Sequence, residues 1–194
     1  MHESVLDWFE RHALDQEFEG RTVVEIGSRW IRGGLRPLIW RRQPASYIGY
    51  DRTLGPGVDE VCEARDLVDR LGLGSVDTVI ATEVMHTAEY WMDVPFAAHQ
   101  LLKPGGTLFL TTRSPGAPVL DFPIDYWRFE IGDIWRILDG WDVLSMEEDE
   151  QIPGVMVKAV RTSAPMADLD EILPQPEQPL PWRPRSRTAQ NTRS

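Results

Sequence analysis

The chain has little of several features that would place it in a specialised class of protein. It holds a single cysteine, Cys62, among 194 residues, which excludes an internal disulfide and a zinc site built from several cysteines. No apolar run approaches the ~20 residues that span a bilayer, and the acidic, amphipathic start is unlike a secretory signal. The four histidines lack the spacing of metal ligands. We therefore expect a cytoplasmic protein with no metal site and no membrane contact.

Positive charge is also scarce. The formal net charge is −11, and it lies within residues 1–161, because four arginines balance four acids in residues 162–194. A field of this sign repels phosphate backbones. The charge therefore argues against nucleic acid as a partner.

The length and the patterning predict one domain followed by a tail. The periodic apolar pattern ends near residue 161, and 194 residues suffice for one domain with a full core. Residues 162–194 hold six of the fifteen prolines and lack periodicity, so we expect a largely disordered tail. Its proline-rich part, PQPEQPLPWRP, leaves open a polyproline segment that binds a partner.

Strands alternate with helices along residues 1–130. Strands are expected at 22–26, 46–50, 59–64, 75–82 and 106–112, and helices at 3–17, 34–42, after the third strand to residue 71, and at 90–102. This alternation predicts a parallel sheet with right-handed crossovers. A helix at 131–138 is then followed by strands at 141–149 and 154–161, whose short link permits only antiparallel pairing. The pattern predicts an α/β protein with a seven-stranded, mostly parallel sheet and one antiparallel strand near the edge.

Residues 22–51 carry the clearest functional signal. An apolar run ends in Glu25 and Gly27, a glycine-containing loop opens a helix, and a second apolar run ends in Asp51. In nucleotide-binding α/β folds such a loop lets the backbone approach a ligand, and the second acid accepts the ribose hydroxyls. The 24 residues from Gly27 to Asp51 are close to the ~20-residue offset of such units. The unit predicts an adenosine-type cofactor.

Five segments in this order resemble a known family over roughly residues 20–161. They are VVEIGS, YIGYD, EARDL, LLKPGGTLFLTT and DYWRF. Together they resemble the class I S-adenosylmethionine-dependent methyltransferases, in a form similar to methyltransferase type 11. The resemblance implies a Rossmann-like, doubly wound fold, S-adenosylmethionine as the cofactor and S-adenosylhomocysteine as its product.

The first loop departs from the family pattern. The usual acid-x-Gly-x-Gly-x-Gly has Arg29 and Ile31 in place of its second and third glycines. A subset of the family has a loop that resembles GSRWIRGGLRPL, followed by the sequence Gly-Pro-Gly-Val-Asp, which stands here at residues 55–59. We interpret the loop as a variant in which Gly27 and Gly33 permit close backbone approach.

The resemblance also implies which residues bind the cofactor. They are Glu25, Gly27, Ser28, Gly33, Asp51, Arg52, Glu63, Ala64, Thr82 and Glu83. In this set Asp51 accepts ribose hydroxyls, Glu25 faces the amino-acid part, and Glu63 accepts the adenine amino group. The residues alone leave other roles open, since Asp51 could cap the turn after its strand and Glu25 could stabilise the loop.

His86 is the candidate catalytic residue, because a histidine pKa near neutrality suits removal of a proton from a hydroxyl or amine. A capping or buried structural histidine is the alternative. The predicted acceptor-binding residues are Arg113, Asp125, Tyr126, Trp127 and Arg128. Arg113 could hold an anionic acceptor or a nearby carboxylate. For the others the alternative is packing, with Trp127 in the core and Arg128 paired with Asp125.

We therefore predict an S-adenosylmethionine-dependent methyltransferase acting on an oxygen or nitrogen atom of a small-molecule acceptor. A non-catalytic methyltransferase-like module that binds a partner is the second hypothesis. An NAD-dependent oxidoreductase is a third, disfavoured because the tight G-x-G-x-x-G loop is missing. A homodimer and a partner bound to the tail are left open.

Overall fold

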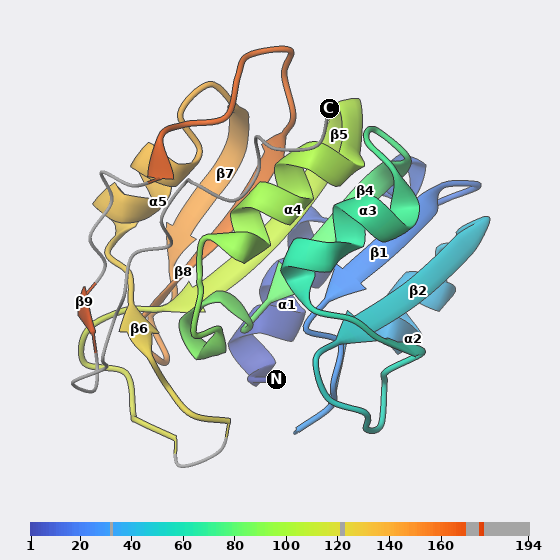
Figure 1. Ribbon diagram of the computed structural model, residues 1–194. Helices are drawn as coiled ribbons and strands as arrows, with labels where there is room; N and C mark the ends of the chain where they lie inside the picture. The colour runs from blue at the N-terminus through green and yellow to red at the C-terminus, as the bar shows by residue number, and fades with distance from the viewer. Residues whose placement is uncertain (32, 121–122, 170–174, 177–194) are drawn as a thin grey trace.

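A single seven-stranded sheet with helices on both faces forms the body of the protein (Figure 1). The structure, a computed structural model, describes residues 1–31, 33–120, 123–169 and 175–176. The strand order is β3-β2-β1-β4-β5-β8-β7. The strands are β1 (Thr22–Ile26), β2 (Ser46–Asp51), β3 (Glu60–Val61), β4 (Val76–Thr82), β5 (Leu102–Arg113), β7 (Asp142–Glu148) and β8 (Gly154–Val160). Only β8 runs antiparallel to its two neighbours, so the predicted fold class is confirmed.

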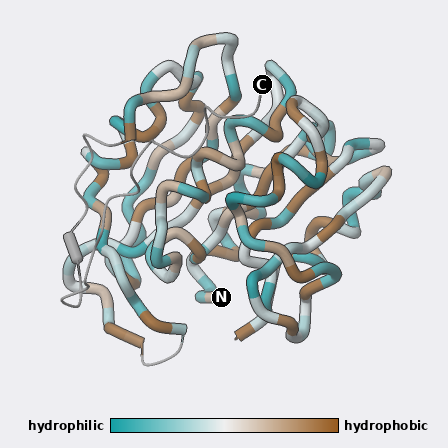
Figure 2. Tube along the Cα trace, in the orientation of Figure 1, coloured by the Kyte–Doolittle hydropathy of each residue, from teal (hydrophilic) through white to brown (hydrophobic). Residues whose placement is uncertain are grey.

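Two apolar clusters fill the space between the sheet and its helices. One cluster joins the sheet to α1 (Glu3–His12) and α2 (Arg36–Trp40). The other joins the opposite face to α3 (Leu67–Leu71), α4 (Asp93–Leu101) and α5 (Ile131–Ile137). The central strands alternate between the clusters because successive side chains point to opposite faces, and apolar residues accordingly follow these strands (Figure 2). Burial on both faces explains why these strands read as continuous apolar runs.

The sheet topology sets the place of the site. Strand β1 pairs with β2 on one side and with β4 on the other, all in parallel. The winding direction of the fold reverses between β1 and β4, and open α/β sheets bind ligands at the carboxyl ends of the strands at such a point. Glu25, Asp51 and Thr82 lie at or near the carboxyl ends of these three strands.

Several predicted boundaries differ from the observed ones. The helix expected over 3–17 ends at His12, where Ala13 turns to extended backbone, and a short 3₁₀ turn follows at Asp15–Glu17. The third strand shortens to two residues, since the chain enters a 3₁₀ turn at Ala64–Asp66. The fifth strand begins at Leu102, with a register irregularity against β4.

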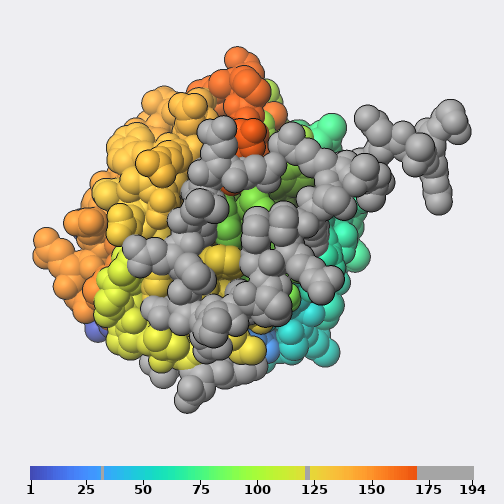
Figure 3. Space-filling view, turned by 60° about the vertical axis from the view of Figure 1, so that its left-hand side comes forward, coloured from blue at the N-terminus to red at the C-terminus, as the bar shows by residue number. Residues whose placement is uncertain are grey.

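Part of the segment that the sequence assigned to the tail lies on the core. Leu169 is buried, and Met166 and Ala167 pack against the same apolar cluster as α4 and α5. In Figure 3 the orange surface leading to residue 169 adjoins the gold surface of α5. Strand β9 (Gln175–Pro176) pairs antiparallel with β6 (Trp127–Arg128). Packed structure therefore continues past the boundary predicted at 161, and the rest of the predicted tail lies outside the described residues.

No helix in the described part of the chain has the length and apolar character needed to cross a bilayer.

Candidate active site

Two adjoining cavities lie at the carboxyl edge of the sheet. The first has a volume of about 200 Å³ and the second of about 230 Å³. The residues that line both are Gly27, Arg29, Ile31, Glu83, Thr87 and Pro123. A shared wall of this extent makes the two cavities neighbouring parts of one cleft.

Six predicted cofactor-binding residues line the first cavity. Gly27 and Glu83 also line the second cavity, whereas Asp51 and Arg52 at the end of β2, and Glu63 and Ala64 after β3, line the first only. One oxygen of Asp51 accepts a hydrogen bond from the backbone N–H of Thr53 at 2.9 Å. Asp51 therefore caps the turn after its strand, as the alternative interpretation expected, and also lines the cavity.

The first loop begins with a glycine that no other residue replaces without strain. Gly27 has φ +77°, and a Cβ there would overlap the side chain of Val84. Gly27 lines both cavities, whereas Gly33, also at positive φ, lines the second only. The backbone of the first loop therefore borders the cleft at these two positions.

Trp30, which stands between the two replaced glycine positions, packs the first loop against a second loop. The edge of its indole ring lies between Gly34 and Gly57, and a Cβ at either glycine would overlap the ring. Its backbone N–H also donates to the carbonyl oxygen of Pro56 at 2.7 Å. The variant loop thus takes up the space next to a second loop, residues 55–59, whose own glycines make room for it. The glycines of the sequence Gly-Pro-Gly-Val-Asp were visible in the sequence, but their contact with Trp30 was not.

Glu25 is buried beneath the first loop and lines the second cavity. The Tyr47 hydroxyl donates a hydrogen bond to its carboxylate, and the Arg36 guanidinium lies 4.7 Å from the centre of the Tyr47 ring. Burial raises the pKa of Glu25 to about 7, against the smaller lowering effect of the Tyr47 hydrogen bond. The carboxyl group therefore titrates near neutral pH.

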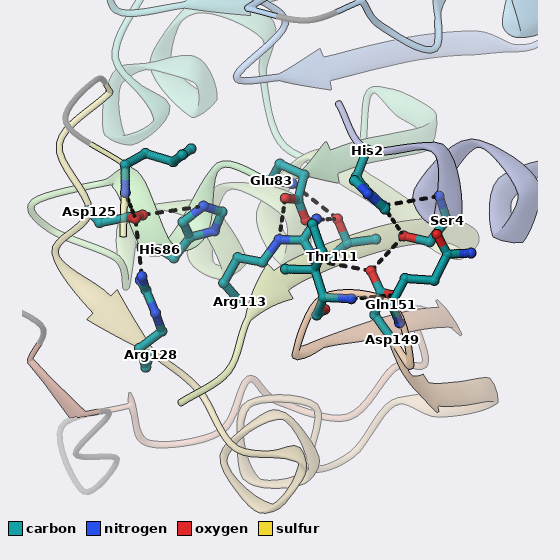
Figure 4. A network of polar contacts seen from close by, with 12 residues as sticks. His2, Ser4, Glu83, His86, Thr111, Arg113, Asp125, Arg128, Asp149 and Gln151 are labelled. Atoms are coloured by element: carbon teal, nitrogen blue, oxygen red, sulfur yellow. Dashed lines mark hydrogen bonds and ion pairs between the residues drawn. The ribbon is translucent and has the colours of Figure 1, made fainter. Parts of the chain in front are cut away.

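Glu83 follows β4 in a left-handed backbone conformation, with φ +58°. Its carboxylate accepts hydrogen bonds from Thr111 Oγ1 at 2.9 Å and from Arg113 Nε at 2.6 Å. Arg113 also donates to Asp149 Oδ2 at 3.0 Å, within the network of Figure 4. Such backbone strain persists where surrounding contacts hold the residue and is common at functional sites. The sequence left Arg113 with either an anionic acceptor or a nearby carboxylate as its partner. In the structure Arg113 pairs with two carboxylates, those of Glu83 and Asp149.

His86 lies in a 3₁₀ turn, Met85–Thr87, and its side chain is buried in the wall of the second cavity. Its Nε2 lies 3.6 Å from Asp125 Oδ1. Burial lowers the pKa of His86, although the carboxylates of Glu83 and Asp125 act in the opposite direction. The imidazole is therefore neutral at neutral pH, which is the form that accepts a proton.

Not all of the predicted acceptor-binding residues face the cleft. Asp125 and Arg113 line the second cavity, whereas Tyr126, Trp127 and Arg128 are not among the described residues that line either one. Trp127 is buried in the core and its Nε1 donates to the carbonyl oxygen of Ala88 at 3.0 Å. Arg128 is buried and pairs with Asp125 at 3.1 Å. Trp127 and Arg128 therefore have the packing role that the sequence gave as the alternative.

The cleft also contains residues to which the sequence assigned no individual role. They include Met1, His2, Thr87, Tyr90, Leu120 and Ile152. Tertiary packing brings them there, as when Ser4 Oγ donates to Asp149 Oδ2 at 2.6 Å and holds the start of α1 next to the network. No local pattern marks such residues.

Several residues that line the second cavity carry buried polar atoms without a hydrogen-bond partner among the described residues. They include Ser28 Oγ, Trp30 Nε1, Thr82 Oγ1, His86 Nδ1 and Asp125 Oδ1. Buried polar atoms are nearly always hydrogen-bonded in native proteins. Their gathering in one cavity indicates a space suited to a polar ligand. The described residues contain no cluster of three or more histidine, cysteine or acidic side chains that could hold a metal ion.

The fold matches those of solved methyltransferase structures. No protein-family model and no curated protein matches the sequence. Among solved structures, an S-adenosylmethionine-dependent methyltransferase from Mesorhizobium loti superposes with a TM-score of 0.63 at 18% identity, over 81% of this chain and 98% of that one. This chain has the class I S-adenosylmethionine-dependent methyltransferase fold.

Other proteins with the methyltransferase fold differ in the atom that they methylate. The Burkholderia thailandensis 1,6-didemethyltoxoflavin-N1-methyltransferase, solved with S-adenosylhomocysteine, matches with a TM-score of 0.63 at 13% identity, over 83% of this chain and 78% of that one. The CurJ carbon methyltransferase matches with a TM-score of 0.55 at 17% identity, over 80% of this chain and 51% of that one. At these identities the likeness shows the fold and leaves the acceptor open.

Proposed function

We propose that the chain is an S-adenosylmethionine-dependent methyltransferase that methylates an oxygen or nitrogen atom of a small-molecule acceptor. The observation that carries this proposal is the pair of adjoining cavities at the switch point of a methyltransferase fold. One contains the residues suited to a nucleoside, and the other contains buried polar atoms without partners and a neutral histidine. Neighbours of the same fold bind S-adenosylhomocysteine.

The residues of the first cavity fit the nucleoside part of the cofactor. Asp51 would accept the two ribose hydroxyls. Glu63 would accept the adenine amino group, and the backbone N–H of Ala64 would meet the adenine ring. Arg52 lies beside them on the cavity wall.

The second cavity fits the amino-acid part and the acceptor. The hydroxyls of Ser28 and Thr82 would gain the hydrogen-bond partners that they lack, and ionised Glu25 would accept from an ammonium group. When bound, S-adenosylmethionine supplies a methyl group on a positively charged sulfur atom. The chain must then hold the acceptor in line with that methyl group, and positioning of this kind contributes about 7–11 kcal/mol. A volume of about 230 Å³ favours a small acceptor.

Calorimetric titration of S-adenosylmethionine and S-adenosylhomocysteine into the wild-type protein tests the proposal. We expect both to bind, and the Asp51→Ala variant to bind roughly tenfold or more weakly, because charge-assisted hydrogen bonds to the ribose are lost. Asp69→Ala, on the exposed surface of α3 and outside both cavities, serves as the matched control.

Two other outcomes would support the alternatives. A folded protein that binds neither compound would be a non-catalytic module. A protein that binds NAD in their place would be an oxidoreductase. Unchanged affinity in Asp51→Ala would remove that residue from the site.

A further inference from the structure

We propose that the acceptor carries an apolar chain, which lies on an apolar strip at the mouth of the cleft while its hydroxyl or amine group occupies the second cavity. The strip consists of Ile31, Val119, Leu120, Pro123 and Ile124. The inference rests on the proposed function, whose acceptor it narrows to an elongated amphipathic molecule.

Two loops contribute the strip, and both project from the carboxyl end of the sheet (Figure 1). Ile31 belongs to the first loop, and the other four residues belong to the loop between β5 and β6. Figure 2 shows hydrophobic residues near the tips of both loops. Ile31 and Pro123 line both cavities, so both loops border the part of the cleft that the two cavities share.

The loop between β5 and β6 is anchored to the rest of the protein. The N–H of Leu120 donates to Asp125 Oδ2 at 2.8 Å, which brings the segment that ends at Leu120 against the segment that begins at Pro123. Main-chain hydrogen bonds join the two ends of the loop to the turn after β4 and to the link between β7 and β8. The loop therefore presents its apolar residues from a fixed base.

The strip is open to solvent although its side chains are apolar. Ile31, Val119, Leu120 and Ile124 are 37–51% exposed. Exposed apolar surface that is contiguous marks a place where a ligand, a membrane or another protein binds. Covering it with an apolar chain removes both from water, and each CH₂ group that is fully buried strengthens binding about fourfold.

The strip continues into the second cavity, and this continuity identifies the kind of molecule that covers it. Leu120 and Pro123 line the cavity together with Pro118 and Ile152. A bilayer or a folded protein can cover the mouth but cannot enter a cavity of about 230 Å³, whereas a small polar group with an apolar chain fits both. The net charge of −11 also repels the anionic surface of a membrane.

The order of polar and apolar groups gives the acceptor one orientation. Glu25, His86 and Asp125 are buried and belong to the second cavity, whereas the strip is exposed at its mouth. An amphipathic acceptor therefore has its polar end inside the cavity and its apolar end on the strip. This orientation leaves its hydroxyl or amine group in the cavity that the proposed function assigns to the acceptor.

Straight-chain primary alcohols from butanol to octanol test the proposal, because they are uncharged and differ only in the length of the apolar chain. Their dissociation constants are measured from the NMR signals of the ¹⁵N-labelled protein in the presence of S-adenosylhomocysteine. We expect each added CH₂ group to strengthen binding to the wild-type protein roughly twofold to fourfold. No binding of any alcohol, or equal binding at every chain length, would overturn the proposal.

Ile124→Ser and Val119→Ser test where the chain lies, since both residues belong to the strip but line neither cavity. We expect each variant to bind octanol roughly threefold or more weakly, because apolar contact is lost, and to bind butanol as the wild type does. Leu144→Ser is the matched control, at an exposed leucine of β7 outside both cavities. Equal affinity for octanol in all four proteins would refute the assignment of the chain to the strip.

Sedimentation of the protein distinguishes the acceptor chain from other molecules that could cover the strip. Binding to phosphatidylcholine vesicles that is lost in Ile124→Ser would assign the strip to a membrane and overturn the proposal. A dimer that is lost in the same variant would assign it to a second copy of the chain, with the same consequence. Calorimetry with S-adenosylhomocysteine alone reports on the cofactor site, so a failure of the proposed function is seen separately from a failure of the strip.

Discussion

At the scale of single residues, the character of the cleft depends on which of its polar groups already have hydrogen-bond or ion-pair partners within the protein. Glu25, Asp51 and Thr82 were predictable from the sequence because parallel strands end at the same edge of a sheet. Whether a group has a partner was not predictable. Arg113 is occupied by Glu83 and Asp149, and these partners come from separate strands and loops, so no local pattern reveals the pairing.

Glu25 makes stability depend on pH in a direction opposite to most acids. Its pKa rises from 4.5 to about 7 on folding, so the folded state binds more protons between these values and loses stability as pH rises through them. The shift corresponds to about 3 kcal/mol. We expect Glu25→Gln to stabilise the protein relative to wild type more near pH 8 than near pH 5, as measured by urea unfolding.

The matched control for this effect is Glu10→Gln, which changes an exposed acid on α1. Its difference from wild type should not grow with pH. The same growth in both variants, or none in Glu25→Gln, would contradict the assignment of this titration to Glu25.

At the scale of elements, the buried strands were the most predictable parts of the fold. Strands β1, β4 and β8 are dense in β-branched residues and are buried on both faces, which gives a strong local signal. Strand β3 lies at the edge of the sheet with only two paired residues, and its sequence signal was correspondingly weak. The contact between Trp30 and the second loop was missed because it joins two irregular segments.

Trp30 and Gly34 should behave as one packing unit. A Cβ at Gly34 would overlap the Trp30 ring, so we expect Gly34→Ala to destabilise the protein by about 1–3 kcal/mol. Trp30→Ala should relieve most of that cost in the double variant. Thermal unfolding of the single and double variants measures the interaction.

Gly132→Ala is the matched control, since a Cβ there meets no atom within 4 Å and the position is helical. It should leave stability unchanged or slightly increased. Additive effects of Trp30→Ala and Gly34→Ala would mean that the ring and the glycine do not constrain one another.

At the scale of the whole molecule, residues that pack on the core continue past residue 161, where the composition predicted the domain to end. The apolar residues Met166, Ala167 and Leu169 cover the side of the sheet that carries α4 and α5. Composition could not identify them, because three apolar residues in a proline-rich stretch carry no periodicity. The packing of these three residues predicts that they contribute to the stability of the protein.

Leu169→Ala tests this closure without shortening the chain. Leu169 is 9% exposed, and truncating a buried leucine costs about 2–5 kcal/mol, so we expect a value near the lower end and a lower melting temperature. Leu73→Ala, at a position that is 70% exposed, should cause little change. Equal melting temperatures for both variants would show that the Leu169 side chain adds no stability.

The placement of β8 has a consequence for synthesis of the chain. Strand β8 is the last to be made of the seven, yet it lies between β5 and β7. Until residue 160 has left the ribosome, one edge of β5 has no strand to pair with, and β7 has no place in the sheet. An open edge of this kind recruits other chains. The interval between emergence of residues 113 and 160 is therefore the period in which a nascent molecule is most exposed to aggregation and most in need of a chaperone.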